Sequence, residues 1–125
     1  MNLKRYFDEH NGFGVLSTAD KDGRVNAAVY SRPHCFEDGT VGFTMPDRLP
    51  YRNLQSNGHA TYLFRQAPEE SGGYDGLRLH LKKVSEDDDQ ARIAQLRRRT
   101  YGDDRDGSHL VIFSVEKELP LVGAA

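Results

Sequence analysis

Apolar and polar residues alternate along several stretches of this chain, which is the pattern of β-strands with one buried face. In the stretch Arg24–Arg32, for example, Asn26, Ala28, Tyr30 and Arg32 share one face. Asp-Gly pairs at 22–23 and 38–39 predict tight hairpin turns before the second and third strands. The alternating stretches predict six strands: Phe13–Thr18, Arg24–Arg32, Thr40–Met45, His59–Phe64, Gly76–Val84 and His109–Lys117.

Two shorter segments favour helices instead. Apolar residues recur at helical spacing over Asn2–His10, which predicts a short amphipathic helix. Asn11-Gly12 after it tolerates the left-handed backbone that ends many helices. Asp47 can cap a helical turn over Arg48–Ser56, in which a proline near the start costs little.

A longer helix is expected to begin at Ser85, because Ser85 and Asp88 have capping-box spacing. Acidic residues follow Ser85, and Arg97–Arg99 place positive charge at the other end, as the helix dipole favours. Six strands joined mostly by hairpins, with one crossover helix, predict a mainly β fold, a small six-stranded antiparallel barrel with short flanking helices. We expect residues 1–125 to form one domain.

Composition narrows the class of protein. With 37% hydrophobic and 29% charged residues, the chain is expected to be folded and soluble. Its formal charge of −2 provides no long-range attraction to nucleic acid or to an anionic membrane. No apolar run suggests a signal peptide or approaches the roughly 20 residues of a membrane span. Cys35 is the single cysteine, so an internal disulfide is excluded, and a cytoplasmic location is expected.

Candidate chemistry gathers where the third strand opens into the basic turn. Thr44 lies near the end of that strand, and Arg48 and Arg52 are four residues apart and share a helical face. A hydroxyl, two guanidinium groups and the unpaired amides of a helix start suit a phosphate group. A solvated basic surface is the alternative interpretation of the same residues.

Other reactive residues carry weaker patterns. Cys35 follows His34, but a thiol nucleophile needs a base beside it in space rather than in sequence. The histidines lack the HxH and HExxH spacings of metal sites, so we predict no metal site, and a haem ligand among them stays open. The histidines are His10, His34, His59, His80 and His109.

The order of these elements resembles the FMN-binding split barrel of the pyridoxamine 5′-phosphate oxidase-like family. The likeness is carried by GVLSTADKDGRVNAAVYSRP at 14–33, GTVGFTMPDRLPYRNLQSN at 39–57, and the late strands GLRLHLKK and HLVIFSVEK. It extends over nearly the whole chain.

The resemblance implies bound FMN, usually at the interface of a homodimer, with the phosphate held by basic and hydroxyl side chains. On this chain it makes Thr44, Arg48 and Arg52 the phosphate-binding candidates. Arg32 and Tyr30 would project from the second strand toward the same region. Many members carry a lysine shortly before the Asn-Leu pair, where this chain has Leu49 and Pro50.

The leading hypothesis is a small cytoplasmic FMN-dependent oxidoreductase with an unknown small-molecule substrate or electron donor. The family's own oxidase is longer and has C-terminal basic and aromatic residues for its pyridoxal substrate, so we expect a different member. No residue can be identified as a catalytic acid, base or nucleophile. The alternatives are a non-enzymatic electron-transfer or sensor module, a deazaflavin or haem-binding barrel, and a fold that has lost its cofactor.

Overall fold

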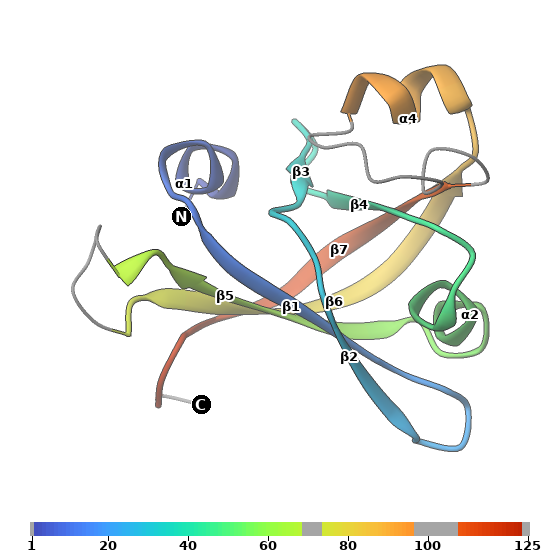
Figure 1. The fold of residues 1–125 in the computed structure, drawn as a ribbon, viewed down its shortest axis with the longest axis horizontal. Coiled ribbons are helices and arrows are strands. Elements are labelled where there is room, and N and C mark those ends of the chain that lie inside the picture. Colours follow the sequence, from blue (N-terminus) through green and yellow to red (C-terminus); the bar gives the residue numbers. More distant parts are fainter. Residues whose placement is uncertain (1, 69–73, 97–107, 124–125) are drawn as a thin grey trace.

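Seven antiparallel strands form one curled sheet in the computed structural model of the chain, which describes residues 2–68, 74–96 and 108–123. The strands follow the order β2-β1-β5-β6-β7-β4-β3 across the half-barrel, so β2 and β3 are its edges (Figure 1). The helices of the described residues are α1 (Leu3–Glu9), α2 (Leu49–Ser56) and α4 (Gln90–Leu96). None of these three is long or apolar enough to cross a membrane. The strands are β1 (Gly12–Ala19), β2 (Val25–Val29), β3 (His34–Cys35), β4 (Val41–Met45), β5 (His59–Gln66), β6 (Gly76–Asp87) and β7 (His109–Pro120).

The predicted split barrel is confirmed, with seven strands in place of six. The additional strand is β3, a two-residue strand that pairs with β4. Two residues after Pro33 are too few to show an alternating pattern, so the sequence did not reveal β3. The expected second strand is also shorter than predicted, because β2 ends at Val29 instead of Arg32.

The helix predicted from Ser85 is wrong at its start. Ser85 lies within β6, which pairs with β7 up to its last residue, and α4 begins only at Gln90. Asp89 provides the cap instead, because its Oδ1 accepts hydrogen bonds from the backbone N–H groups two and three residues further on, at 3.0 and 3.4 Å. The expected basic end, Arg97–Arg99, lies outside the described residues.

The N-terminal helix is confirmed, but its predicted end is not. Asn2 caps α1, and its Oδ1 accepts a hydrogen bond from the backbone N–H three residues on at 3.0 Å. No left-handed residue follows, because His10 has extended backbone that leads directly into β1. Gly12 is needed there for space: a Cβ at this position would lie 2.1 Å from the carbonyl oxygen of Arg65.

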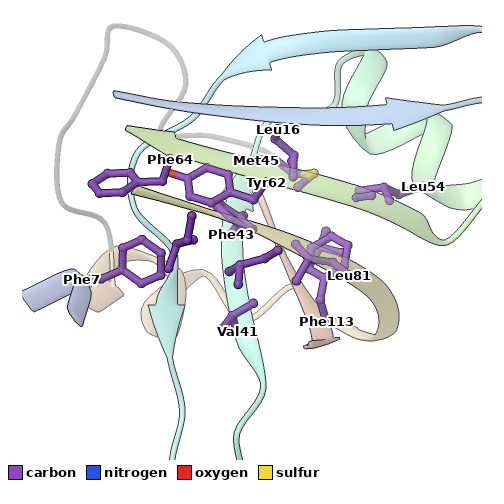
Figure 2. Packing of buried hydrophobic residues seen from close by; sticks show 14 residues of the cluster. Phe7, Leu16, Val41, Phe43, Met45, Leu54, Tyr62, Phe64, Leu81 and Phe113 are labelled. Carbon is purple, nitrogen blue, oxygen red and sulfur yellow. The ribbon is translucent and has the colours of Figure 1, made fainter. Parts of the chain in front are cut away.

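Aromatic side chains fill the inner face of the half-barrel (Figure 2). The ring centroid of Phe43 lies 5.0 Å from that of Tyr62 and 6.0 Å from that of Phe113, and all three side chains are buried. The hydroxyl of Tyr62 donates to the carbonyl oxygen of Tyr30 at 3.1 Å, so its polar end is satisfied inside the core. Gly14 makes room for that hydroxyl, since a Cβ there would lie 1.9 Å from it.

Candidate functional site

Three of the five residues predicted to bind the cofactor lie between residues 44 and 52, from the end of β4 to the first turn of α2, which we call the β4–α2 segment. Thr44 is half-buried on β4, where it pairs with Leu110 of β7. Arg48 is the exposed N-cap residue just before α2, and its carbonyl oxygen accepts a hydrogen bond from the backbone N–H of Arg52 at 3.0 Å. The first turn of α2 therefore carries both guanidinium groups, a short distance along the chain from the Thr44 hydroxyl.

Asp47 does not cap α2, in contrast to the sequence prediction. The residue at the N-cap position is Arg48, which makes no side-chain capping hydrogen bond. The Asp47 carboxylate instead accepts a hydrogen bond from Nε of Arg52 at 3.3 Å. Both side chains are exposed, and exposed ion pairs contribute only about 0–1 kcal/mol to stability. A more highly charged anion can therefore compete with Asp47 for Arg52.

Tyr30 and Arg32, the other two predicted residues, are engaged in contacts with the core and with α1. The Tyr30 ring packs edge-on against the core residue Phe43, with centroids 5.9 Å apart. Nη1 of Arg32 donates to the carbonyl oxygens of Phe7 and His10 at 2.6 and 2.9 Å, at the C-terminal end of α1. These contacts assign structural roles to both side chains, and their part in cofactor binding stays a prediction.

A polar network that the sequence did not reveal joins α2 to β6. We call Tyr51, Gln55, Lys83 and Glu86 the Glu86 network. The Tyr51 hydroxyl donates to Oε1 of Glu86 at 2.7 Å, and Nε2 of Gln55 donates to Oε2 at 2.8 Å. The ammonium of Lys83 also pairs with Oε2. Both oxygens of the carboxylate are therefore engaged by the helix.

The charge of the Glu86 network is well defined. Burial alone would raise the pKa of Glu86, but the hydrogen bonds from Lys83, Tyr51 and Gln55 outweigh it and lower the pKa to about 2. Burial, together with the neighbouring Glu86 carboxylate, raises the pKa of the Tyr51 hydroxyl above its ordinary value. At neutral pH the network therefore contains a neutral phenol that donates to a charged carboxylate.

His109 extends this network toward α4. Its ring stacks on Tyr51, with centroids 3.8 Å apart and planes at 6°, and its Nδ1 lies 2.7 Å from Oδ1 of Asp88. Ligand atoms of Glu86, Asp88 and His109 all lie within 4.8 Å of one another, a spacing that a metal ion could use. Lys83 already supplies a positive charge to Glu86 there, which favours a hydrogen-bonded network over a metal centre.

The opposite side of α2 is held by two asparagines. The buried Asn53 donates from Nδ2 to the hydroxyl of Thr18 on β1 at 3.1 Å. At the C-terminal end, Nδ2 of Asn57 donates to the carbonyl oxygen of Asp20 at 3.4 Å. Hydrogen bonds therefore hold α2 to β1 on one side and to β6 on the other, and together they set the orientation of the helix on the sheet.

Apolar side chains also cover part of the outer face of the sheet. Val15 on β1 pairs with Val29 on one side and with Leu63 on the other, so these three side chains form a row across three strands. Val25 is 82% exposed and Val29 66% exposed. We call this surface the outer apolar face; its members are Phe13, Val15, Val25, Ala27, Val29 and Leu63.

A shallow groove of about 280 Å³ lies on the same side of the sheet. A polar row crosses it, because Thr61 of β5 pairs with Ser17 of β1 and with His80 of β6. Nδ1 of His59 lies 3.8 Å from Glu116 at its rim. None of the five predicted residues lines the groove. The alternation of polar and apolar residues along β5 and β6 places Thr61 and His80 on one face of the sheet. This pattern was the sequence signal available for finding the groove.

Comparisons with known proteins identify the class of fold. No protein-family model matches the sequence, and no curated protein matches it. Among solved structures, an FMN-binding protein from Syntrophomonas wolfei superposes with a TM-score of 0.79 at 21% identity, over 98% of this chain and 86% of that chain. An F420 reductase gives a TM-score of 0.65 at 17% identity, over 91% of this chain and 94% of that chain.

A third match is a protein from Clostridium acetobutylicum related to general stress protein 26, of the pyridoxinephosphate oxidase family. It has a TM-score of 0.63 at 17% identity and covers 91% of this chain and 82% of that chain. At such identities the likeness concerns the fold. The chain has the split-barrel fold of pyridoxamine 5′-phosphate oxidase-like proteins, which confirms at the level of the fold the resemblance found in the sequence.

Proposed function

We propose that this protein binds FMN between the two subunits of a homodimer and acts as a small cytoplasmic flavin-dependent oxidoreductase. The observation that carries the proposal is the superposition of 98% of the chain on an FMN-binding protein with a TM-score of 0.79. Bound FMN would supply the electron-transfer chemistry, and the protein would supply binding and orientation.

The donors on the β4–α2 segment fit the phosphate of such a cofactor. Arg52 already holds a carboxylate, that of Asp47, in an exposed pair at 3.3 Å. A phosphate carries more charge and more acceptor oxygens than a carboxylate, so it can displace Asp47 from this guanidinium group. Arg48 and the Thr44 hydroxyl would complete the phosphate site. Pro50 and Leu49 add no side-chain donor, so the two arginines would provide its positive charge.

The outer apolar face supports the dimer. Exposed contiguous apolar surface costs free energy in water, and on soluble proteins it commonly marks an interaction site. A second copy of the chain offers the same apolar surface, and a twofold interface would bury both. The polar row of Ser17, Thr61 and His80 would then lie beside a slot closed to water.

The experiment that tests the proposal is a titration of the protein with FMN, followed by the quenching of flavin fluorescence. The double substitution Arg48→Ala and Arg52→Ala should lower FMN affinity at least tenfold, because hydrogen bonds to charged groups are each worth about 1.5–3 kcal/mol. Arg5→Ala is the matched control, because Arg5 is an exposed arginine in an ion pair with Glu9. Unchanged affinity in the double variant would contradict the phosphate site.

Substitution of Asp47 gives an opposite effect on the same site. Asp47→Asn removes the carboxylate that competes for Arg52, so FMN affinity should rise. A fall in affinity would show that Asp47 supports the site instead. Oxidation of NADH or NADPH by the flavin-loaded protein would distinguish an enzyme from an electron-transfer or sensor module.

A deazaflavin is the second candidate cofactor, and the likeness to an F420 reductase favours it. Competition between FMN and the deazaflavin for the same protein would decide between them. Tighter binding of the deazaflavin would assign the protein to that class of split barrel.

A further inference from the structure

We propose that Glu86 and Tyr51 are positioning residues that hold α2 in the orientation needed for Arg48 and Arg52 to bind the phosphate of the cofactor. This inference rests on the proposed function. Neither residue is expected to touch the cofactor. Their effect would pass through the helix that carries the two arginines.

The hydrogen bonds between α2 and Glu86 have a geometry that suits a positioning role. Tyr51 and Gln55 are one turn apart on α2 and therefore point to the same side of the helix. They donate to the two different oxygens of the Glu86 carboxylate, at 2.7 and 2.8 Å. Two bonds to one carboxylate restrict both the position of the helix and its rotation about its own axis, which a single bond would not do.

Tyr51 also occupies a place in the helix that couples it to the two arginines. It lies between Arg48 and Arg52 in the sequence, within the same turn. A rotation of α2 that moves Tyr51 away from Glu86 also moves both guanidinium groups relative to Thr44, which belongs to β4 and stays with the sheet. Geometry between these three donors therefore depends on the bond from Tyr51 to Glu86.

The rest of the Glu86 network supports the same contact. The Lys83 ammonium pairs with Glu86 and lies 3.5 Å from the carbonyl oxygen of Leu54 in α2, so it bridges the strand and the helix. The ring of His109, stacked at 3.8 Å, limits the movement of the Tyr51 ring. The Glu86 carboxylate, the Tyr51 hydroxyl and the Lys83 ammonium each have a partner within the network. Their contact joins α2 to β6, two elements that are distant in the sequence.

A comparison of two ligands tests this inference. FMN and riboflavin share the ring system, but only FMN has the phosphate. In Tyr51→Phe and Glu86→Gln, FMN affinity should fall about three- to tenfold while riboflavin affinity stays within a factor of two, because each variant loses a hydrogen bond that orients only the phosphate donors. The affinity of the double variant should fall by less than the product of the two single effects, because both substitutions act on the same contact between α2 and β6.

Two substitutions serve as controls. Tyr74→Phe removes the hydroxyl of an exposed tyrosine, and Glu118→Gln neutralises an exposed glutamate, so neither should change the affinity for FMN or riboflavin. Equal loss of both ligands in Tyr51→Phe, or no loss of either, would overturn the positioning role while the proposed function stands. Failure of the wild-type protein to bind FMN would instead overturn the proposed function, and the positioning role with it.

Discussion

The inner and outer faces of the same strands differ sharply in how their apolar side chains are used. On β5, Tyr62 and Phe64 point inward and are fully buried, whereas Leu63 between them points outward and is 36% exposed. On β1, Leu16 is buried inside, whereas its neighbour Val15 belongs to the outer row. The inner face is complete within one chain, but the outer face exposes apolar surface that the described chain does not cover.

The two faces of the sheet are expected to contribute to different properties of the protein, the inner face to its stability and the outer face to its interactions. Packing of the inner face holds the half-barrel together, and its residues are expected to tolerate little change. The outer apolar face adds little to the stability of one chain, and its exposed valines are the surface that the proposed dimer would bury. The helix α2 has both a buried and an exposed side, because Leu54 is buried in the core while Arg48 and Arg52 are exposed.

The largest expected effect comes from the core. Phe113→Ala should lower the free energy of unfolding by about 3–5 kcal/mol, because it opens a cavity beside Phe43. The matched substitution on the outer face is Phe13→Ala, which removes the same ring from a residue that is 56% exposed. It should cost less than about 1 kcal/mol for the monomer. Urea unfolding measures both, and equal losses would contradict the contrast between the faces.

A smaller effect, dependent on pH, is expected from the Glu86 network. Glu86→Gln should lower the free energy of unfolding by about 1–3 kcal/mol at neutral pH. The pKa of Glu86 is lowered from 4.5 to about 2, so the stability from its ionised form is fully present above pH 4.5 and is lost as pH falls toward 2. The difference between wild type and variant should therefore narrow below pH 4.5. A constant difference from pH 7 to pH 3 would argue against this assignment.

Substitutions on the outer apolar face should change assembly more than stability. Val29→Asp places a charge within the proposed interface, so the dimer should dissociate into folded monomers. The free energy of unfolding of the monomer should change by less than about 0.5–1 kcal/mol. Light scattering and circular dichroism measure the two properties. A variant that remains a dimer would place the interface elsewhere.

The smallest effect on stability is expected at the basic turn. Arg52→Ala removes an exposed ion pair with Asp47, which contributes at most about 1 kcal/mol. Thermal unfolding should therefore be almost unchanged, although FMN affinity should fall. A large loss of stability would mean that Arg52 has a structural role that its contacts do not reveal.

The strands could be predicted from the sequence because alternation is a local pattern, and each of the six predicted strands is present. Alternation alone could not show which face of β2 points to the core. The helix at Ser85 was misplaced because the capping spacing of Ser85 and Asp88 occurs by chance within the end of a strand. Pairing with β7 decides the structure there, and such pairing is not visible locally.

The candidate site was predictable only where it is continuous in the chain. Thr44, Arg48 and Arg52 lie within nine residues, so a local pattern could identify them. The bond from Tyr51 to Glu86 joins residues 35 positions apart, and only the fold brings them together. Similarly, Arg32 was expected on a strand face, but β2 ends before it and its guanidinium group caps α1.

The central claim is that this split barrel holds FMN in a dimer, and gel filtration after incubation with FMN tests it most directly. Absorbance of the eluted protein should show the twin flavin bands in the visible range, at the elution volume of two chains. Colourless protein, or flavin that elutes only with a monomer, would contradict the account.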